Sequence, residues 1–186
     1  MKQIVLILAA AGGLANSGCS PDPDRTPPSA FEGPATASPG ASTGPALTIG
    51  GLDRLRIGQE VPAQSGWEVG RETAGGGCAT ARSKDYPGIY AIVEDSKVRR
   101  ITVGEGSKIT LAEGIGVGSE ESKVKASFPS FREEPHKYED APAKYIGSPD
   151  VKPGSLGWRF EINSAGKVSR IHVGQMPVLA YVEGCG

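Results

Sequence analysis

Two stretches of the chain carry the same alternation of apolar and polar residues. Residues 89–104 and 157–174 each read as a strand, a polar turn of Asp-Ser or Asn-Ser-Ala-Gly, and then Lys-Val-x-Arg-Ile-x-Val-Gly. In the second strand of the first copy, Ile101 and Val103 alternate with polar neighbours, and the other copy has Ile and Val at the same places. A period of two is typical of a half-buried antiparallel strand. The pattern therefore predicts two β-hairpins built from one repeated unit.

A glycine-containing segment precedes each hairpin, at residues 55–59 in the first copy and 115–119 in the second. In the second copy Ser119 is suited to open a helix, the glutamates after it favour the positive helix end, and Pro129 stops the run. In the first copy Pro62 and nearby glycines leave the helix short or lost.

These elements together predict an α+β fold. We expect two tandem units, at about 52–104 and 114–174, each a helix plus a β-hairpin, that join into one antiparallel sheet with helices on one face. The unit resembles the repeat of the tandem-repeat β-lactamase inhibitory proteins and the small lipoproteins of the outer-membrane assembly machinery. Those families reuse one scaffold for different tasks. No loop matches the residues that the inhibitor inserts into its target, so the resemblance assigns no contact residue.

The chain begins as an export signal does. Lys2 precedes an apolar run over residues 4–15. This run is too short to span a bilayer, which takes a helix of about 20 residues. It fits a secretory signal peptide in residues 1–18.

Small residues stand directly before Cys19, in the order Leu-Ala-Asn-Ser-Gly-Cys. This order resembles the lipobox of bacterial lipoprotein signals, which implies that Cys19 is lipidated and anchors the protein to a membrane of the cell envelope. Asn16 departs from the pattern, which prefers Leu there, so ordinary cleavage after Ser17 and a secreted soluble protein are the alternative. Ser20 is not the Asp that resembles an inner-membrane retention signal. In a Gram-negative cell the resemblance thus implies the outer membrane, facing the periplasm.

Composition separates a tether from a folded part. Residues 19–46 are rich in Pro, Ser, Thr, Gly and Ala, with Phe31 as their only large apolar residue. Such a segment buries too little apolar surface to fold, so we expect a disordered tether. Residues 47–186 have the length of a single globular domain. The chain has 20 Lys and Arg against 21 Asp and Glu. Without a basic excess, we expect no nucleic-acid partner.

The chain has three cysteines. With Cys19 lipidated, the domain retains Cys78 and Cys185 as an even pair. An oxidising compartment favours a disulfide between them. A free or metal-binding thiol is the alternative.

Motifs for catalysis or for a cofactor are few. The glycine-rich residues 114–119 lack the last Gly of a dinucleotide-binding fingerprint, so we interpret them as a turn. The two histidines have no partner at metal-ligand spacing, and the sequence contains no Gly-x-Ser-x-Gly elbow. The four carboxylates of residues 133–140 fit a solvated charged loop better than a hydrolytic pair. We expect no metal, no cofactor and no enzymatic activity.

Four side chains are candidate contacts for a partner: Trp67, His136, Tyr138 and His172. Trp67 lies in a Gly-rich segment where we expect exposure, and His136 and Tyr138 lie in the charged loop. His172 takes the place of Thr102 in the other copy, at a position expected to face solvent. We expect a non-enzymatic module that binds an envelope protein or a cell-wall component. The alternatives are an inhibitor of a secreted hydrolase and a small periplasmic enzyme with an unrecognised site.

Overall fold

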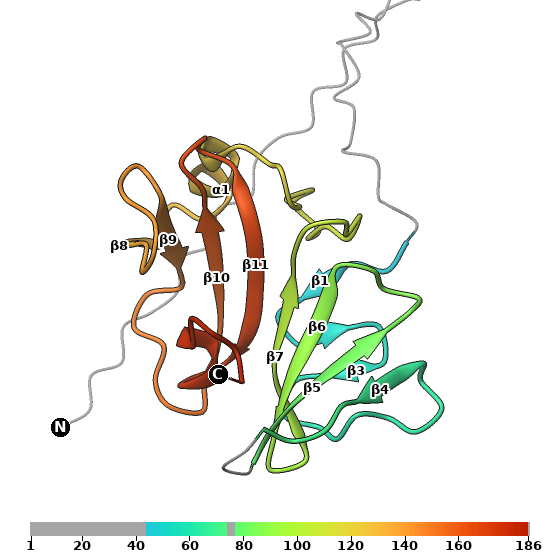
Figure 1. Cartoon of the computed structure of the whole chain (residues 1–186). Coiled ribbons are helices and arrows are strands. Elements are labelled where there is room, and N and C mark those ends of the chain that lie inside the picture. The colour runs from blue at the N-terminus through green and yellow to red at the C-terminus, as the bar shows by residue number, and fades with distance from the viewer. Residues whose placement is uncertain (1–43, 74–76, 186) are drawn as a thin grey trace, which may run out of the picture. The chain divides into compact units, whose positions relative to one another are not determined.

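The computed structural model describes residues 44–73 and 77–185, which form two antiparallel sheets (Figure 1). The signal peptide (1–18), Cys19 and all but the end of the tether (19–46) lie outside the described residues. The small sheet has the order β1-β2-β3, and the large sheet has the order β4-β5-β6-β7-β11-β10-β9-β8. The elements are β1 (Leu47–Thr48), β2 (Gly51–Leu52), β3 (Leu55–Arg56), β4 (Trp67–Val69), β5 (Cys78–Ser83), β6 (Ile89–Glu94), β7 (Lys97–Val103), α1 (Glu121–Ser127), β8 (Arg132–Pro135), β9 (Lys144–Gly147), β10 (Leu156–Ile162), β11 (Val168–Gln175) and the 3-10 helix η1 (Val178–Ala180).

Both predicted hairpins are present, as β6–β7 and β10–β11. The first turns at Asp95 and Ser96, whose φ angles of 50° and 61° are those of a two-residue turn that matches the twist of the strands. Each hairpin also has a register shift at the equivalent place, after Ile92 in one and after Glu161 in the other. The repetition therefore extends to local irregularities of the backbone.

The glycine segments of the two copies make the same contact with their hairpins. The Gly58 N–H donates to the Val98 carbonyl at 2.7 Å, and the Gly118 N–H donates to the Val168 carbonyl at 2.8 Å. In return the Val98 N–H donates to the carbonyl of Gln59, and the Val168 N–H donates to that of Ser119. Residues 114–119 therefore form a structural turn, as interpreted from the sequence.

The two copies meet where β7 pairs with β11. Thr102 lies opposite His172, and Ile101 lies opposite Val173. Because Thr102 and His172 are equivalent in the two copies, the antiparallel pairing relates β4–β7 to β8–β11 by a local pseudo-two-fold axis between these two residues. Figure 1 shows the two four-stranded halves side by side, with β7 next to β11.

The expected α+β class, with helices on one face, is wrong. The described residues contain one α-helix, the seven-residue α1, and Val124 is its only buried side chain. Its N-cap is Glu120 without a side-chain bond, because the Ser119 hydroxyl accepts instead from the Gly116 N–H. In the described part of the chain no helix has the length and hydrophobicity needed to cross a membrane.

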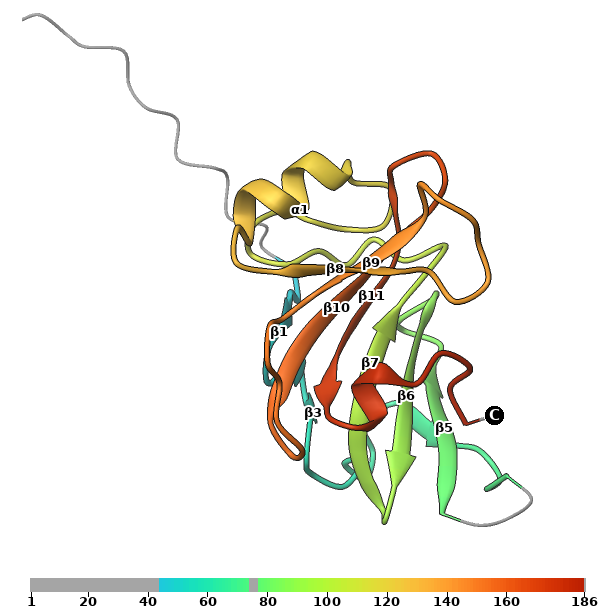
Figure 2. The same cartoon turned by 90° about the vertical axis from the view of Figure 1, so that its left-hand side faces the viewer.

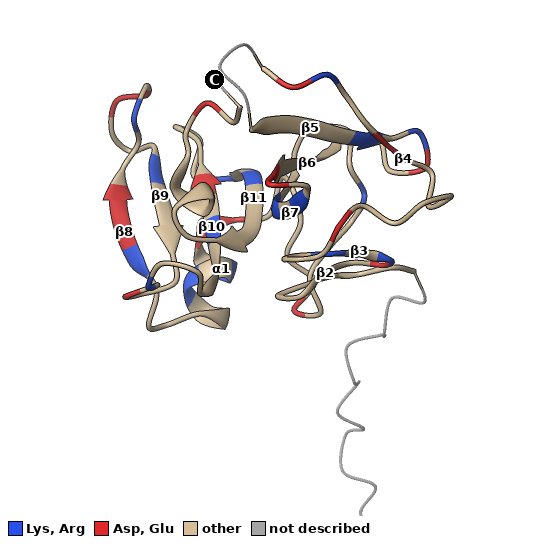
Figure 3. Ribbon diagram, turned by 90° about the horizontal axis from the view of Figure 1, so that it is seen from below, with Lys and Arg blue, Asp and Glu red and all other residues tan. Residues whose placement is uncertain are grey.

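The core lies between the inner face of the large sheet and a cover made mostly of β1–β3 and loops. Leu52, Leu55 and Ile115 from the cover pack with sheet residues such as Ile101 and Phe160. This layer replaces the expected helices because its leucines and isoleucines already bury the inner face. In Figure 3, β2, β3 and α1 lie on one side of the large sheet and the C-terminal end lies on the other, its outer face.

The disulfide expected between Cys78 and Cys185 is present, with the two Cα atoms 5.6 Å apart. Cys78 begins β5, and Cys185 lies in the C-terminal segment that follows β11. The bond therefore attaches this segment to the outer face of the first half of the sheet.

The β7–β11 pairing can be tested at two equivalent glycines. A Cβ atom on Gly174 would lie 2.4 Å from the Arg99 carbonyl oxygen, whereas a Cβ atom on Gly104 would have no neighbour closer than 3.6 Å. Gly174→Ala should lower the free energy of unfolding by roughly 1–3 kcal/mol, because backbone must move to relieve the overlap. Gly104→Ala should change it by less than about 0.5 kcal/mol. Urea denaturation measures both, and equal effects would contradict the register.

Candidate functional site

The outer face of the large sheet is rich in arginine and tyrosine. Along each strand, the side chains that face the core are apolar. The positions between them point to the outer face and include Arg82, Tyr90, Arg100, Tyr145, Arg159 and Arg170. The Arg159 guanidinium lies 3.7 Å from the centroid of the Tyr145 ring, and that of Arg82 lies 5.2 Å from the Tyr90 ring. These are cation–π distances. Arginine and tyrosine are among the residues enriched at protein interfaces.

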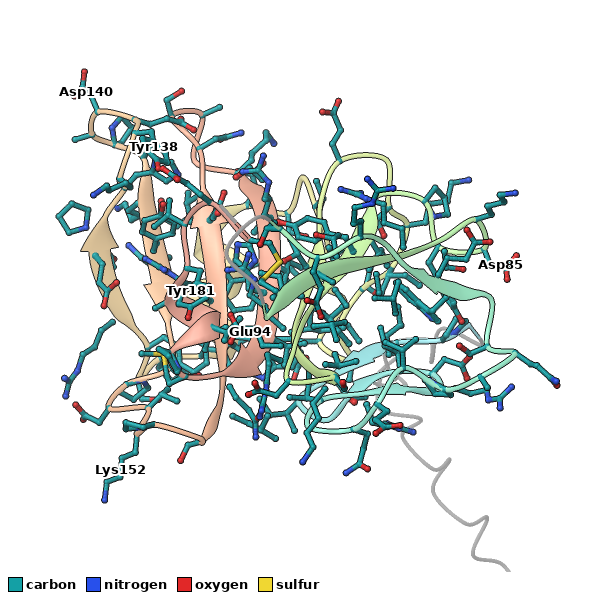
Figure 4. The ribbon with its side chains drawn as sticks, turned by 60° about the horizontal axis from the view of Figure 1, so that its bottom comes forward. Asp85, Glu94, Tyr138, Asp140, Lys152 and Tyr181 are labelled. Carbon is teal, nitrogen blue, oxygen red and sulfur yellow. A yellow bond between two sulfur atoms is a disulfide. The ribbon has the colours of Figure 1, made fainter. Side chains whose placement is uncertain are left out.

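A cavity of about 460 Å³ opens on this face. Tyr90, Glu161 and Arg170 contribute from the sheet, and His136 and Tyr138 contribute from the loop between β8 and β9. Residues 182–185 of the C-terminal segment form a further wall. We call this site the outer cavity. Figure 4 shows Tyr138 on its loop and Tyr181 on the C-terminal segment, with the disulfide drawn in yellow.

A buried polar network lies next to the outer cavity. The Thr102 hydroxyl is 2.9 Å from His172 Nδ1, and His172 Nε2 is 3.0 Å from Glu161 Oε1. The second Glu161 oxygen accepts from Arg170 at 2.7 Å. Three of the members come from the second half of the sheet and Thr102 comes from the first. The network therefore crosses the pseudo-two-fold axis.

The charges of this network follow from burial and from its hydrogen bonds. Burial lowers the pKa of His172 to about 4, against a smaller opposing effect of Glu161. Burial also acts to raise the pKa of Glu161, but the bonds from His172 and Arg170 outweigh it and set that pKa to about 2. At neutral pH His172 is thus uncharged and Glu161 is ionised. His172 then donates from Nε2 to Glu161 and accepts the Thr102 proton at Nδ1.

Thr102, His172 and Glu161 have the connectivity of a nucleophile, a base and an orienting acid. Thr102, however, is 0% exposed and His172 is 4% exposed. Neither residue lines the outer cavity, so a substrate carbonyl has no path to the hydroxyl in this conformation. The arrangement instead satisfies the buried polar groups of the central strands.

Arg100 fixes the C-terminal segment on the outer face. Its side chain is 1% exposed and donates to the carbonyl oxygens of Val178 and Tyr181. Burial lowers the pKa of Arg100 from its ordinary value. Arg159 donates to the Ala180 carbonyl at 2.8 Å. Two guanidinium groups thus bind three backbone carbonyls, and η1 lies against β7, β10 and β11 (Figure 2).

Two of the four candidate contacts, His136 and Tyr138, lie together at the outer cavity. His136 Nδ1 accepts from the backbone N–H groups of Tyr138 and Glu139, and its ring stacks on Tyr145 with the centroids 4.6 Å apart. His136 therefore holds the loop in shape. Tyr138 is 60% exposed, and its hydroxyl donates to Glu183. This hydrogen bond raises the pKa of Tyr138.

The expected exposure of Trp67 and His172 is wrong. Trp67 is 8% exposed, because β4 turns it to the inner face, where it stacks on Tyr86. The glycines on either side of β4 mark the ends of that strand, and they do not make Trp67 exposed. His172 does project from the outer face, as the alternation requires, but η1 packs across β11 and closes that face to solvent. Neither side chain is placed to touch a partner directly.

The alternation of the repeat does not by itself mark the arginines and tyrosines of the outer face as functional. Arg100 and Arg170 occupy the same position of the repeated Lys-Val-x-Arg-Ile pattern, where a polar residue fills each gap. That regularity was the available signal. It did not reveal that Arg100 binds a segment lying more than 70 residues later in the chain.

Residues 44–73 and 77–185 contain no cluster of three or more His, Cys, Asp or Glu side chains able to hold a metal ion. Glu133, from the carboxylate-rich loop, pairs instead with Lys125 and Lys144. Comparison of the chain with protein-family models, with curated proteins and with solved structures finds no match.

The buried histidine predicts a dependence of stability on pH. The pKa of His172 is about 4 in the folded chain, whereas its ordinary value is 6.5, so between these pH values the unfolded chain binds the extra proton. Stability should fall as the pH drops from 6.5 to 4, by up to about 3 kcal/mol from this group. In His172→Gln this part of the loss should disappear. Chemical denaturation at several pH values measures it, and equal slopes in the parent and the variant would refute the assignment.

Proposed function

We propose that residues 47–186 form a non-enzymatic binding module of the cell envelope, which binds a protein partner through the outer face around the outer cavity. The main support is a difference between the two faces of the repeated sheet. On the inner face both copies keep apolar residues, as at Ile101 and Ile171. On the outer face Arg100 and Arg170 match, but the less buried pairs differ: Tyr90 is equivalent to Arg159, and Arg82 to Gly147.

The matching inner positions have a plain physical reason, since both halves bury that face in one core. Packing alone places no such demand on the exposed parts of the outer face. The exchange of side-chain size and charge between the copies at these outer positions is the change expected when a surface becomes specific for a partner.

The size of the sheet agrees with this proposal. Eight strands at about 4.8 Å spacing span about 34 Å, and a strand of six residues is about 20 Å long. A standard protein interface takes about 800 Å² of each partner. The outer face, with the C-terminal segment that covers its centre and the adjoining loop, presents a surface of comparable size.

The loop between β8 and β9 borders this surface and presents Tyr138. Its neighbours are mostly charged. The strand β8, which leads into the loop, carries Glu133 and Glu134 and is largely red in Figure 3. Residues that anchor a protein interface are commonly aromatic side chains surrounded by polar residues, as Tyr138 is here. A cell-wall component is the other class of partner that we propose.

An inhibitor of a secreted hydrolase is a more specific form of the same proposal. It draws on the resemblance of the repeat to the β-lactamase inhibitory proteins. Titrating the purified domain into assays of secreted hydrolases tests it, and slower turnover at stoichiometric concentration would support it.

A small periplasmic enzyme is the alternative class, and the Thr102–His172–Glu161 chain is the one observation in its favour. The burial of Thr102 argues against it. Hydrolysis of an envelope ester, glycan or peptide by the purified domain, lost in Thr102→Val, would support this alternative and overturn the binding module.

We also propose that Cys19 is lipidated and anchors the module, an assignment that lies outside the described residues. Cys19→Ala should move the protein from the membrane fraction to the soluble envelope fraction, because the lipid is its only proposed anchor. Cell fractionation and the mass of the N-terminal peptide measure this. An unchanged distribution, with no acyl mass on the parent peptide, would refute it.

The binding surface can be tested with a photo-crosslinking amino acid at Tyr138 in living cells. A partner should be captured there and not from Ser122, an exposed residue of α1 on the other side of the sheet. With the captured partner purified, Tyr138→Ala should weaken binding about 30-fold, equivalent to roughly 2 kcal/mol for an interface anchor. Lys108→Ala, a change at another exposed position, should leave affinity unchanged. Equal capture at Tyr138 and Ser122 would refute the assigned surface.

A further inference from the structure

The C-terminal segment is attached to the outer face in two parts, and the first part is packed. Val178 and Leu179 are buried, and Arg100 and Arg159 bind the carbonyl oxygens nearby. The fit over β10 is close, because a Cβ atom on Gly157 would lie 2.9 Å from a methyl group of Leu179. This part, which ends at Tyr181, has the contacts of ordinary folded structure.

The second part, residues 182–185, is attached very differently. Among the described residues, no backbone hydrogen bond joins it to the rest of the chain. Tyr138 donates to the exposed Glu183, and Gly184 lies beside Ile92 and Arg100. The covalent bond from Cys185 to Cys78 is the remaining attachment. The disulfide is thus the strongest restraint on this part.

Residues 182–185 also form a wall of the outer cavity. We propose that they are a lid on the outer cavity, closed by the Cys78–Cys185 disulfide and opened when a dithiol reductant reduces it. Opening gives a partner wider access to the sheet side of the cavity, where Tyr90 is half-buried. This regulation rests on the function proposed above.

The chemistry needs a thiolate to reach a sulfur atom. Cys78 and Cys185 are both half-buried rather than enclosed, and Cys185 lines the cavity. A thiolate of the reductant attacks one sulfur and forms a mixed disulfide, and the other protein sulfur leaves as a thiolate. The second thiol of the reductant then releases the first cysteine. Two electrons pass to the protein, two protons give two cysteine thiols, and the reductant becomes a disulfide.

The rest of the fold does not depend on the lid. The hydrophobic core lies on the inner face, and η1 retains its own buried side chains and arginine contacts when residues 182–185 are released. Reduction should therefore free residues 182–185 without unfolding the sheet. This separation is what makes the proposal testable.

Backbone order measured by NMR relaxation decides whether the lid opens. The full chain with Cys19→Ser retains only Cys78 and Cys185, and dithiothreitol serves as the dithiol. On reduction the order parameters of residues 182–185 should fall from about 0.85 to below about 0.6, while those of β10 and β11 stay unchanged. In a chain with Cys78→Ser and Cys185→Ser added, the reductant should change nothing. Lid residues that stay ordered after reduction, or a reduced sheet that unfolds, would overturn the proposal.

A second measurement decides whether the lid controls binding. A photo-crosslinking residue at Arg82, which lines the outer cavity, should capture the partner more efficiently in the reduced chain than in the oxidised one. Equal capture in both forms would overturn the regulation while the binding function stands. Capture in neither form would overturn the binding function itself, and the relaxation data would still decide whether the disulfide holds the lid.

Discussion

The antiparallel pairing of β7 with β11 is the constraint on which the remaining structure depends. It places Thr102 opposite His172 and thereby joins two four-stranded halves into one sheet. Because a strand alternates its side chains between faces, a shift of one residue would turn Ile101 and Val103 outward. The inner face, the polar network and the positions of the outer arginines all follow from this one register.

The same register explains why the two faces of the sheet have different characters. The inner face buries its side chains under β1–β3, α1 and loops, so both copies keep apolar residues there. The outer face is covered along its centre by η1, which needs close approach at Gly157 and hydrogen-bond donors for its carbonyl groups. Arg100 and Arg159 supply those donors. Coverage by so short a segment leaves the cavity and its aromatic and charged side chains open beside it.

Burial of polar groups at the centre of the sheet is stable only because nearly every group has a partner. Glu161 receives bonds from His172 and Arg170, and the His172 ring uses both of its nitrogen atoms. An ion taken from water costs several kcal/mol unless hydrogen bonds replace its hydration. A network of this kind fixes the relative position of the strands that contribute to it. Here it joins the two halves across the pseudo-two-fold axis.

The sequence by itself determined the repeated hairpins, the glycine turns and the cysteine pair. These are local features: the alternation around Ile101 and Ile171 sets a strand with two faces, and an even pair of exported cysteines favours a bond. The tertiary structure alone decided what covers each face. Strands as short as β1–β3 are too short to show a period of two. The sequence therefore did not reveal that these strands, and not helices, cover the inner face. The burial of His172 and the binding of the C-terminal segment by Arg100 could not be predicted from the sequence either. Contacts between residues far apart in the chain leave no trace in the local pattern around either residue.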